Sequence, residues 1–264
     1  MTEAKIGLVG IPFDGNSSYA TGAAAAPSAI RTAFTCDASN TWNEAMQDVA
    51  AHLVDLGDAT LSDATDQDDG VRCVLDRYPD VEQFVFLGGD HSVTYPILRA
   101  MAPRFPNLTL IHFDAHPDLY PEFNGNRYSH ACPMMRIMEA GLAQRIIQVG
   151  IRTMNDVQLE QARRFNAEVI AMKDWPRALP TITGPAYLTF DMDVLDPAFA
   201  PGVSHREPGG MNVREAMWAI SELSGWLVAA DIVELNPQRD PGGLSATVAA
   251  KMLKEIAGRM LRHF

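Results

Sequence analysis

Short apolar runs alternate along the chain with longer stretches in which apolar residues recur every three or four positions. The short runs are rich in β-branched and aromatic residues and predict strands at residues 5–9, 52–56, 83–87, 108–113, 146–149, 168–170, 186–190 and 226–232. The longer stretches predict helices near residues 26–34, 69–77, 93–102, 133–140, 156–165, 213–223 and 247–260. This alternation is typical of a mainly parallel sheet with helices on both faces. We therefore expect a three-layer α/β/α fold with a sheet of about eight strands.

The length of 264 residues allows one large α/β domain or two small ones. No internal repeat, low-complexity tract or Gly/Ser-rich linker interrupts the alternation of predicted strands and helices. We therefore interpret residues 1–264 as a single domain.

Groups of acidic residues and histidines lie at the ends of four predicted strands. They are Gly88-Gly89-Asp90-His91-Ser92, Asp114-Ala115-His116-Pro117-Asp118, Asp191-Met192-Asp193 and Asp231-Ile232-Val233-Glu234. One aspartate at a strand end commonly caps the next helix and means little alone. Ligands of open α/β sheets, however, bind at the carboxyl ends of the strands. Four such groups therefore predict one shared site at this edge of the sheet.

Six side chains of these groups make a candidate metal-ligand set of four carboxylates and two imidazoles. They are His91, Asp114, His116, Asp118, Asp191 and Asp193. So much negative charge is unfavourable inside a folded protein unless cations neutralise it, and two divalent ions are the simplest solution. Oxygen-rich ligands with imidazoles suit manganese better than a thiolate-preferring metal, and zinc, cobalt, nickel and iron remain alternatives. A metal pair of this kind is typical of hydrolases.

The spacing of the acidic residues predicts how a single strand end presents several ligands. Asp114, His116 and Asp118 are two residues apart, and in an extended segment their side chains share one face. The Asp-Met-Asp group repeats this spacing. Asp90 directly precedes His91, and we expect it to support the backbone or the imidazole of that ligand.

Composition excludes several classes of partner. The net charge of −12 argues against binding to a nucleic-acid backbone, which requires a clustered basic face. No apolar run approaches membrane-spanning length, and the first residues contain no apolar core of a signal peptide. The 3 cysteines have no CxxC spacing and are expected to be reduced thiols. These features predict a cytoplasmic protein that contacts neither nucleic acid nor membrane.

Three motifs carry a resemblance to a known family. They are Gly-Gly-Asp-His-Ser from Gly88, Asp-Ala-His-x-Asp from Asp114, and Phe-Asp-Met-Asp-Val-Leu-Asp-Pro-Ala-Phe-Ala-Pro-Gly from Phe190. They resemble the motifs of ureohydrolases, a family that includes arginase, agmatinase, guanidinobutyrase, proclavaminate amidinohydrolase and formimidoylglutamase. The similarity runs from Gly10 to Pro237. It implies an arginase-like fold and hydrolysis of a small guanidino compound to urea and an amine.

The resemblance also implies how the ligands are shared. One metal would be held by His91, Asp114, Asp118 and Asp191, and the other by His116, Asp114, Asp191 and Asp193. The guanidinium carbon is stabilised by resonance and is a poor electrophile. Two cations that share a water lower its pKa and so supply the strong nucleophile that this reaction needs.

Two further residues receive catalytic roles from the resemblance. Glu234, in Asp-Ile-Val-Glu-Leu-Asn-Pro, is expected to bind and orient the planar guanidinium group. His130, in Tyr-Ser-His-Ala, matches the family's proton-shuttle position and is expected to protonate the departing amine.

The loops around the site bear on the substrate. Arginases typically carry a Ser-Gly-Asn-x-His-Gly run, whereas this chain has Asn-Gly-Asn-Arg-Tyr-Ser-His-Ala at residues 124–131. That loop and Glu207-Pro-Gly-Gly resemble agmatinases, so agmatine is favoured, with His205 and Glu207 bordering the substrate. Arg127 or Arg206 could instead pair with a carboxylate of a guanidino or formimino acid. Formimidoylglutamase, guanidinobutyrase and arginase activities therefore remain alternatives.

Two other classes of protein are compatible with part of the pattern. A binuclear metallophosphoesterase also uses Asp and His ligands, but no basic or Asn-based phosphate clamp accompanies them here. A non-catalytic ureohydrolase-like subunit typically loses metal ligands, and all six positions are intact. Because the family commonly forms trimers or hexamers, we expect a homo-oligomer by resemblance.

Overall fold

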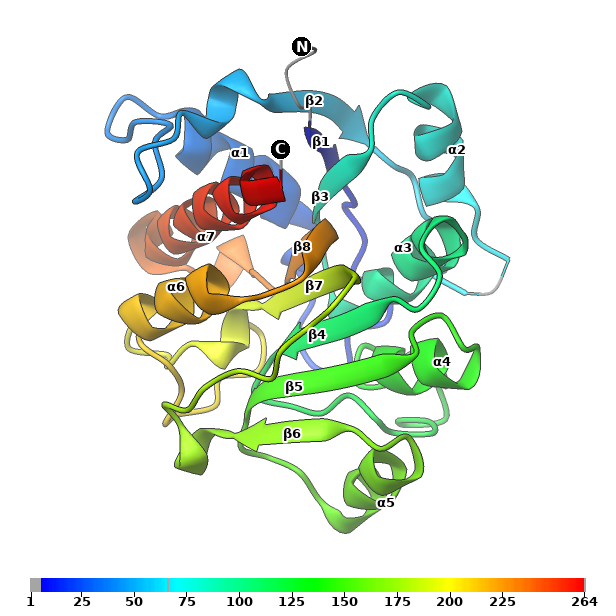
Figure 1. The fold of residues 1–264 in the computed structure, drawn as a ribbon. Helices are drawn as coiled ribbons and strands as arrows, with labels where there is room; N and C mark the ends of the chain where they lie inside the picture. Colours follow the sequence, from blue (N-terminus) through cyan, green and yellow to red (C-terminus); the bar gives the residue numbers. More distant parts are fainter. Residues whose placement is uncertain (1–5, 66, 264) are drawn as a thin grey trace.

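The chain folds around one parallel sheet, which Figure 1 shows in a computed structural model that describes residues 6–65 and 67–263. The strands are β1 (Ile6–Gly10), β2 (Leu53–Asp58), β3 (Gln83–Leu87), β4 (Thr109–Phe113), β5 (Arg145–Ile151), β6 (Glu168–Ala171), β7 (Pro185–Asp191) and β8 (Trp226–Val233). They lie in the order β2-β1-β3-β8-β7-β4-β5-β6, and every neighbouring pair is parallel. The predicted fold class is confirmed. Lys5, predicted as the first residue of the first strand, lies outside the described residues.

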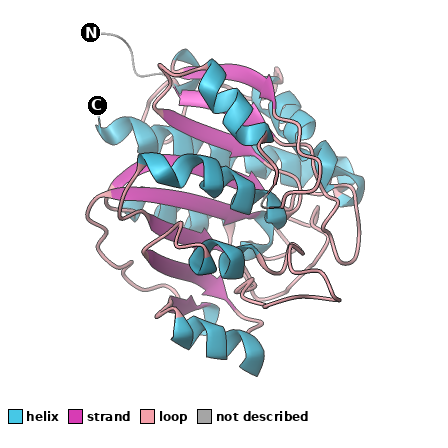
Figure 2. Cartoon of the chain, turned by 90° about the vertical axis from the view of Figure 1, so that its right-hand side faces the viewer, coloured by secondary structure: helices cyan, strands magenta, loops and turns pink. Residues whose placement is uncertain are grey.

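Helices cover both faces of the sheet (Figures 1 and 2). They are α1 (Ala26–Thr35), α2 (Gly70–Arg77), α3 (Thr94–Met101), α4 (Pro133–Glu139), α5 (Asp156–Arg164), α6 (Val213–Glu222) and α7 (Leu244–Met260). Buried residues of α1, α6 and α7 belong to one apolar core, and those of α2, α3, α4 and α5 belong to another. The sheet therefore separates two cores, as the three-layer prediction requires. Among the described helices, none is both long and apolar enough to cross a membrane.

The central strands are apolar because both of their faces are covered. Every residue of β3 and β4 is buried, although Gln83, Thr109 and His112 are polar. A strand that is buried on both faces appears in the sequence as a continuous apolar run, which is why these strands could be predicted with nearly correct ends.

The last helix begins earlier than its periodicity predicts. We expected it to start at residue 247, but α7 starts at Leu244. The carboxylate of Asp240 accepts the N–H groups of Ser245 at 2.8 Å and Ala246 at 2.9 Å. Asp240 thus caps the first turn across Gly243, whose φ of 73° a glycine adopts readily.

The order of the strands brings the predicted site together. The four acidic groups occur at the carboxyl ends of β3, β4, β7 and β8, which are neighbours in the middle of the sheet. Segments more than a hundred residues apart, such as His91 and Glu234, therefore meet at one edge.

Candidate active site

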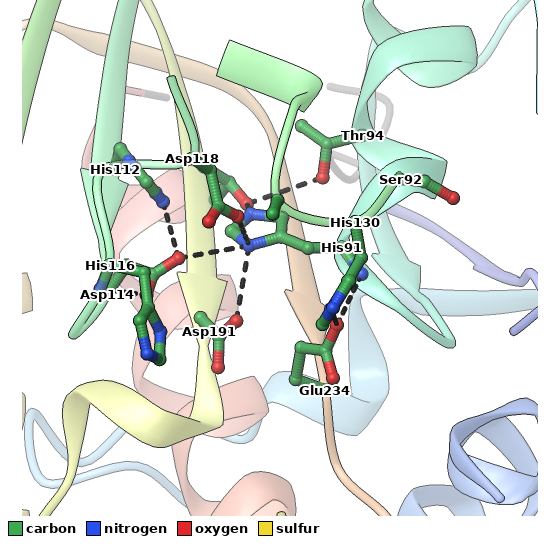
Figure 3. A network of polar contacts seen from close by, with 12 residues as sticks. His91, Ser92, Thr94, His112, Asp114, His116, Asp118, His130, Asp191 and Glu234 are labelled. Atoms are coloured by element: carbon green, nitrogen blue, oxygen red, sulfur yellow. Dashed lines mark hydrogen bonds and ion pairs between the residues drawn. The ribbon is translucent and has the colours of Figure 1, made fainter. Parts of the chain in front are cut away.

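The imidazole of His91 lies among three carboxylates, as the dashed lines in Figure 3 show. Its Nδ1 atom is 3.1 Å from Oδ2 of Asp114, 3.1 Å from Oδ2 of Asp118 and 3.2 Å from Oδ2 of Asp191. We call these four residues the His91 group, and all of them are buried. Two ligand atoms bound to one divalent ion at a right angle, each about 2.1 Å from it, lie about 3.0 Å apart. The spacing within the His91 group fits that of ligands around one metal ion.

The second ring nitrogen of His91 is held by a threonine hydroxyl, and this contact turns the first nitrogen toward the carboxylates. Its Nε2 is 2.9 Å from Oγ1 of Thr189, and the Thr189 hydroxyl donates to Oδ1 of Asp231 at 2.5 Å. Because a hydroxyl carries one hydrogen, Thr189 accepts from the Nε2–H of His91. Nδ1 then faces three acidic oxygens, and this buried atom has no hydrogen-bond partner in the described part of the chain. Burial lowers the pKa of the imidazole, but the three carboxylates outweigh burial and raise it, so positive charge is favoured at this position. A divalent cation fits this donor set.

A second group of possible ligands shares Asp114 with the first. Nδ1 of His116 lies 3.3 Å from Oδ1 of Asp114 and 3.0 Å from Oδ2 of Asp193. We call these three residues the His116 group. Oδ2 of Asp114 thus faces His91 and Oδ1 faces His116, so this carboxylate is positioned to bridge two ions. Asp191 joins the His91 group through Oδ2.

Crowding of carboxylates makes the site unfavourable without cations. Burial raises the pKa of Asp191 well above its usual range, and the charges of Asp193 and Asp114 raise it further. Burial and the charge of Asp114 also raise the pKa of Asp193. Bound cations favour the ionised forms of all three groups.

The ligands converge through turns rather than through the extended segment that we expected. β4 ends at Phe113, and Asp118 has a φ of 52°, a left-handed conformation that is uncommon for residues other than glycine. The chain therefore turns back, and Asp118 joins Asp114 beside His91 while His116 belongs to the other group. In the same way, the 3-10 turn Met192–Val194 follows β7 and separates Asp191 from Asp193.

His130 and Glu234 form a buried ion pair next to the His91 group (Figure 3). Nδ1 of His130 is 2.9 Å from Oε1 of Glu234, and the same oxygen accepts the backbone N–H of His91 at 2.8 Å. Glu234 directly follows β8 with a φ of 64°, an uncommon conformation that is concentrated at functional sites. On its other side, Nε2 of His130 lies 2.8 Å from the hydroxyl of Ser18.

The ion pair changes the protonation of both partners. Burial alone lowers the pKa of His130, but the charge of Glu234 and its hydrogen bond outweigh burial and raise that pKa to about 9. Burial alone raises the pKa of Glu234, but the charge and hydrogen bond of His130 outweigh it and lower that pKa. In the absence of substrate, the two side chains therefore hold opposite charges at neutral pH.

The arrangement of the site agrees with the comparison to known proteins. The model of the arginase family matches residues 4–258. The chain belongs to the arginase family. It is 39% identical to the mitochondrial arginase 1 of Arabidopsis thaliana, over 98% of this chain and 82% of that protein. It is 30% identical to an agmatinase of Bacillus cereus, over 96% of this chain and 91% of that protein.

A solved arginase structure from Medicago truncatula superimposes with a TM-score of 0.90 at 36% identity, covering 98% of this chain and 88% of that chain. The resemblance to ureohydrolases and the arginase-like fold are thus confirmed. Members of this family are hydrolases that act on guanidino compounds, so this chain is a hydrolase of that class.

A cavity of about 240 Å³ lies over the His91 group and the His116 group of this arginase-family chain. Its lining includes His130 and Glu234 as well as His205 and Glu207, the residues predicted to border the substrate. The ring of His205 lies 4.9 Å from that of His130 and 6.3 Å from that of His116, measured between centroids. The structure therefore brings these residues to one cavity, and their contact with substrate stays a prediction.

The two arginines considered as carboxylate partners have other partners in the protein. Arg127 lies 3.7 Å from Glu139 and over the ring of Tyr128. Arg206 donates to the carbonyl groups of Pro201 and Arg239. Neither side chain lines the cavity described above, although Arg206 lines an adjoining hollow that shares His116, His205 and Glu207 with it.

Asp90 supports the loop of His91, as its position in the sequence predicts. Its Oδ1 accepts the N–H of Ser92 at 3.0 Å, and its Oδ2 accepts the N–H of Asn16 at 2.8 Å. The carbonyl of Asn16 in turn accepts the N–H of His130. Asp90 therefore supports the backbone of the site, and the hydrogen bonds of its carboxylate go to Asn16, Ser17 and Ser92 rather than to the His91 imidazole.

Several polar residues of the site were missed at the level of sequence. Thr189 lies two residues before Asp191 and His112 lies two residues before Asp114, each inside a strand that otherwise looks apolar. Side chains two residues apart in a strand share one face. In the sequence, a polar residue two positions before a strand-end ligand was therefore the signal for a side chain that hydrogen-bonds to a ligand residue. Ser18, in the loop after β1, had no comparable signal.

Proposed function

We propose that this chain is a binuclear-metal hydrolase that cleaves the guanidino C–N bond of a small substrate to give urea and an amine. The observation that carries the proposal is the His91 group, in which a buried imidazole nitrogen faces three carboxylate oxygens and has no hydrogen-bond partner among the described residues. Membership in a family of guanidino hydrolases supplies the class of reaction.

The proposed ligand set follows the two groups. His91, Asp114, Asp118 and Asp191 would hold one ion, and His116, Asp114, Asp191 and Asp193 the other. Contacts among the described residues support this division for every position except the second role of Asp191, which rests on the resemblance. Manganese is the proposed metal, because the ligands are mostly oxygen atoms with two imidazoles.

The residues of the cavity perform the remaining steps. When bound, the metal pair activates a water as the nucleophile. Glu234 offers a carboxylate to the planar guanidinium and fixes its orientation. To do so it exchanges its ion pair with His130 for one with the substrate. His130, which its pairing with Glu234 keeps protonated before the substrate binds, donates a proton to the departing amine nitrogen and regains one from solvent at the Ser18 side.

L-arginine is the first substrate we propose. The support is the 39% identity to a plant arginase, compared with 30% to an agmatinase. Agmatine, favoured by the Ser-His-Ala loop and the Glu-Pro-Gly-Gly segment, is the second candidate. A guanidino or formimino acid is less well supported, because Arg127 and Arg206 are bonded elsewhere.

The substrate is tested by comparing kcat/KM for L-arginine, agmatine, guanidinobutyrate and formiminoglutamate on the manganese-loaded protein. We expect urea from the guanidino compounds, with L-arginine best by at least about tenfold, since a site that hydrogen-bonds a polar group of its substrate rejects an analogue that lacks this group, as agmatine lacks the carboxylate. Agmatine as the best substrate would reverse the order of the two candidates. Formamide without urea would contradict the reaction itself.

Three properties extend the proposal beyond the site. We infer a trimer or hexamer from the habit of the family, and light scattering of the purified protein measures it. We infer a cytoplasmic location from the composition of the chain. The proposed substrate is a small cation, and the net charge of −12 is compatible with attracting it and with repelling nucleic acid.

A further inference from the structure

His112 is a buried histidine of the site to which neither the family motifs nor the proposed reaction gives a role. It lies in β4, two residues before Asp114, and is fully buried. Its Nε2 is 2.7 Å from Oδ2 of Asp114, the oxygen that also faces His91. A ring nitrogen of His112 also lies within 4.8 Å of ligand atoms of His91, Asp114 and Asp118, so His112 could itself be a metal ligand. Which nitrogen of His112 carries a hydrogen decides between a ligand and a hydrogen-bond donor.

The position of the hydrogen on His112 follows from its contact with Gln148 in the neighbouring strand β5. The side-chain Nε2 of Gln148 lies 2.7 Å from the carbonyl oxygen of Pro117 and 2.9 Å from Nδ1 of His112. A carbonyl oxygen only accepts hydrogen bonds, so the amide nitrogen of Gln148 must face Pro117. Turning the amide over would place two acceptor oxygens about 2.7 Å apart, which is unfavourable in a buried site.

The second hydrogen of the Gln148 amide therefore points to Nδ1 of His112. Nδ1 must accept it, so Nδ1 carries no hydrogen and the hydrogen of the ring is on Nε2. The Nε2–H donates to Oδ2 of Asp114. Oδ1 of the same carboxylate accepts the backbone N–H of His116 at 2.6 Å. Each carboxylate oxygen of Asp114 thus accepts one hydrogen bond, and the two bonds together fix the orientation of the carboxylate plane.

We propose that His112 is a positioning residue that orients the bridging carboxylate of Asp114, with its tautomer set by Gln148 and the Pro117 carbonyl. All four residues of the chain Pro117–Gln148–His112–Asp114 are buried, and each N–H donor in it has one acceptor within 2.9 Å. Supporting hydrogen bonds of this kind fix the direction of a ligand's lone pairs. The inference rests on the proposed metal site for its consequence, but the tautomer itself does not depend on metal.

Nitrogen-15 NMR of histidine side chains in the metal-free protein tests the tautomer directly. The His112 signals are identified by their loss in His112→Gln. We expect Nε2 to be protonated and Nδ1 to show the shift of an unprotonated nitrogen that accepts a hydrogen bond. In Gln148→Leu the Nδ1 signal should move toward that of an unprotonated nitrogen without a hydrogen-bond donor, while the carboxylate of Asp114 still keeps the hydrogen on Nε2. A protonated Nδ1 in the wild-type protein would overturn the proposal, whatever the protein does with metals.

Metal affinity tests the consequence. Calorimetric titration with Mn²⁺ should give roughly 10–100-fold weaker binding for His112→Leu, since losing a partner of a ligand typically has that effect. His112→Gln keeps an N–H near Asp114 and should recover part of the affinity. His52→Gln is the matched control, because His52 precedes β2 at the opposite edge of the sheet.

The outcomes separate the two proposals. Wild-type affinity in His112→Leu would show that Asp114 needs no help from His112 and would overturn the positioning role. X-ray absorption of the loaded wild type that requires a third imidazole ligand would also overturn it, because His112 would then be a ligand. A wild type that binds no metal at all would contradict the proposed function, while the NMR result on the tautomer would stand.

Discussion

At the scale of single residues, the site is determined by which atoms carry hydrogen. His91 directs a lone pair into the carboxylates because Thr189 and Asp231 hold its other nitrogen. Asp231 also accepts the hydroxyl groups of Thr94 at 2.8 Å and Tyr187 at 2.6 Å. Three hydroxyl donors around one buried carboxylate keep it as an acceptor, which in turn keeps Thr189 a donor toward it.

The ion pair of His130 predicts a pH-dependent stability in the metal-free protein. The folded-state pKa of about 9 lies above the value of roughly 6.5 for an unfolded histidine. Such a group contributes stability that is fully present below about pH 6.5 and is lost as the pH rises through about 9. Denaturant unfolding should therefore show a larger difference between wild type and His130→Phe at pH 6 than at pH 9.5.

The control for this prediction is the partner of the histidine. In Glu234→Gln the raised pKa of His130 loses its main positive cause, so the same pH dependence should disappear. A difference between wild type and His130→Phe that is equal at both pH values would contradict the ion pair as the source.

At the scale of secondary-structure elements, strands could be predicted from sequence and turns could not. The ends of β3 and β4 follow from continuous apolar runs, and the acidic residues after them mark the edge where ligands bind. The left-handed conformations of Asp118 and Glu234 have no sequence signal, because both side chains contact a residue far away in the sequence. The carboxylates of Asp118 and Glu234 contact the imidazole and the backbone N–H of His91, respectively. For this reason the structure brings the predicted ligand residues together, while the extended geometry expected for them was wrong.

The start of α7 gives a prediction at the same scale. Replacing Asp240 by Ala removes the acceptor for two N–H groups of the first turn and should lower the free energy of unfolding by about 1 kcal/mol. Asp240→Asn, which keeps an acceptor oxygen for one of the two groups, should lower it less. Chemical denaturation of both variants measures the difference, and equal losses would show that charge rather than capping is important there.

At the scale of the whole molecule, the order of the strands creates the site. β3, β8, β7 and β4 are adjacent in the sheet although their sequences are far apart, so four strand ends deliver acidic residues and histidines to one edge. Helices on both faces bury the central strands, so the acidic residues lie where the strands end and the cavity begins. The same arrangement occurs in an arginase structure that covers 98% of this chain with a TM-score of 0.90.

The central claim is that this edge holds two metal ions, and metal content measures it most directly. Elemental analysis of the folded, manganese-saturated protein, after removal of free metal, should give two ions per chain, as in other binuclear hydrolases. Asp114→Ala, which removes the carboxylate shared by the His91 and His116 groups, should lose both ions, whereas Asp118→Ala should chiefly weaken one. One ion or none in the folded wild type would contradict the account.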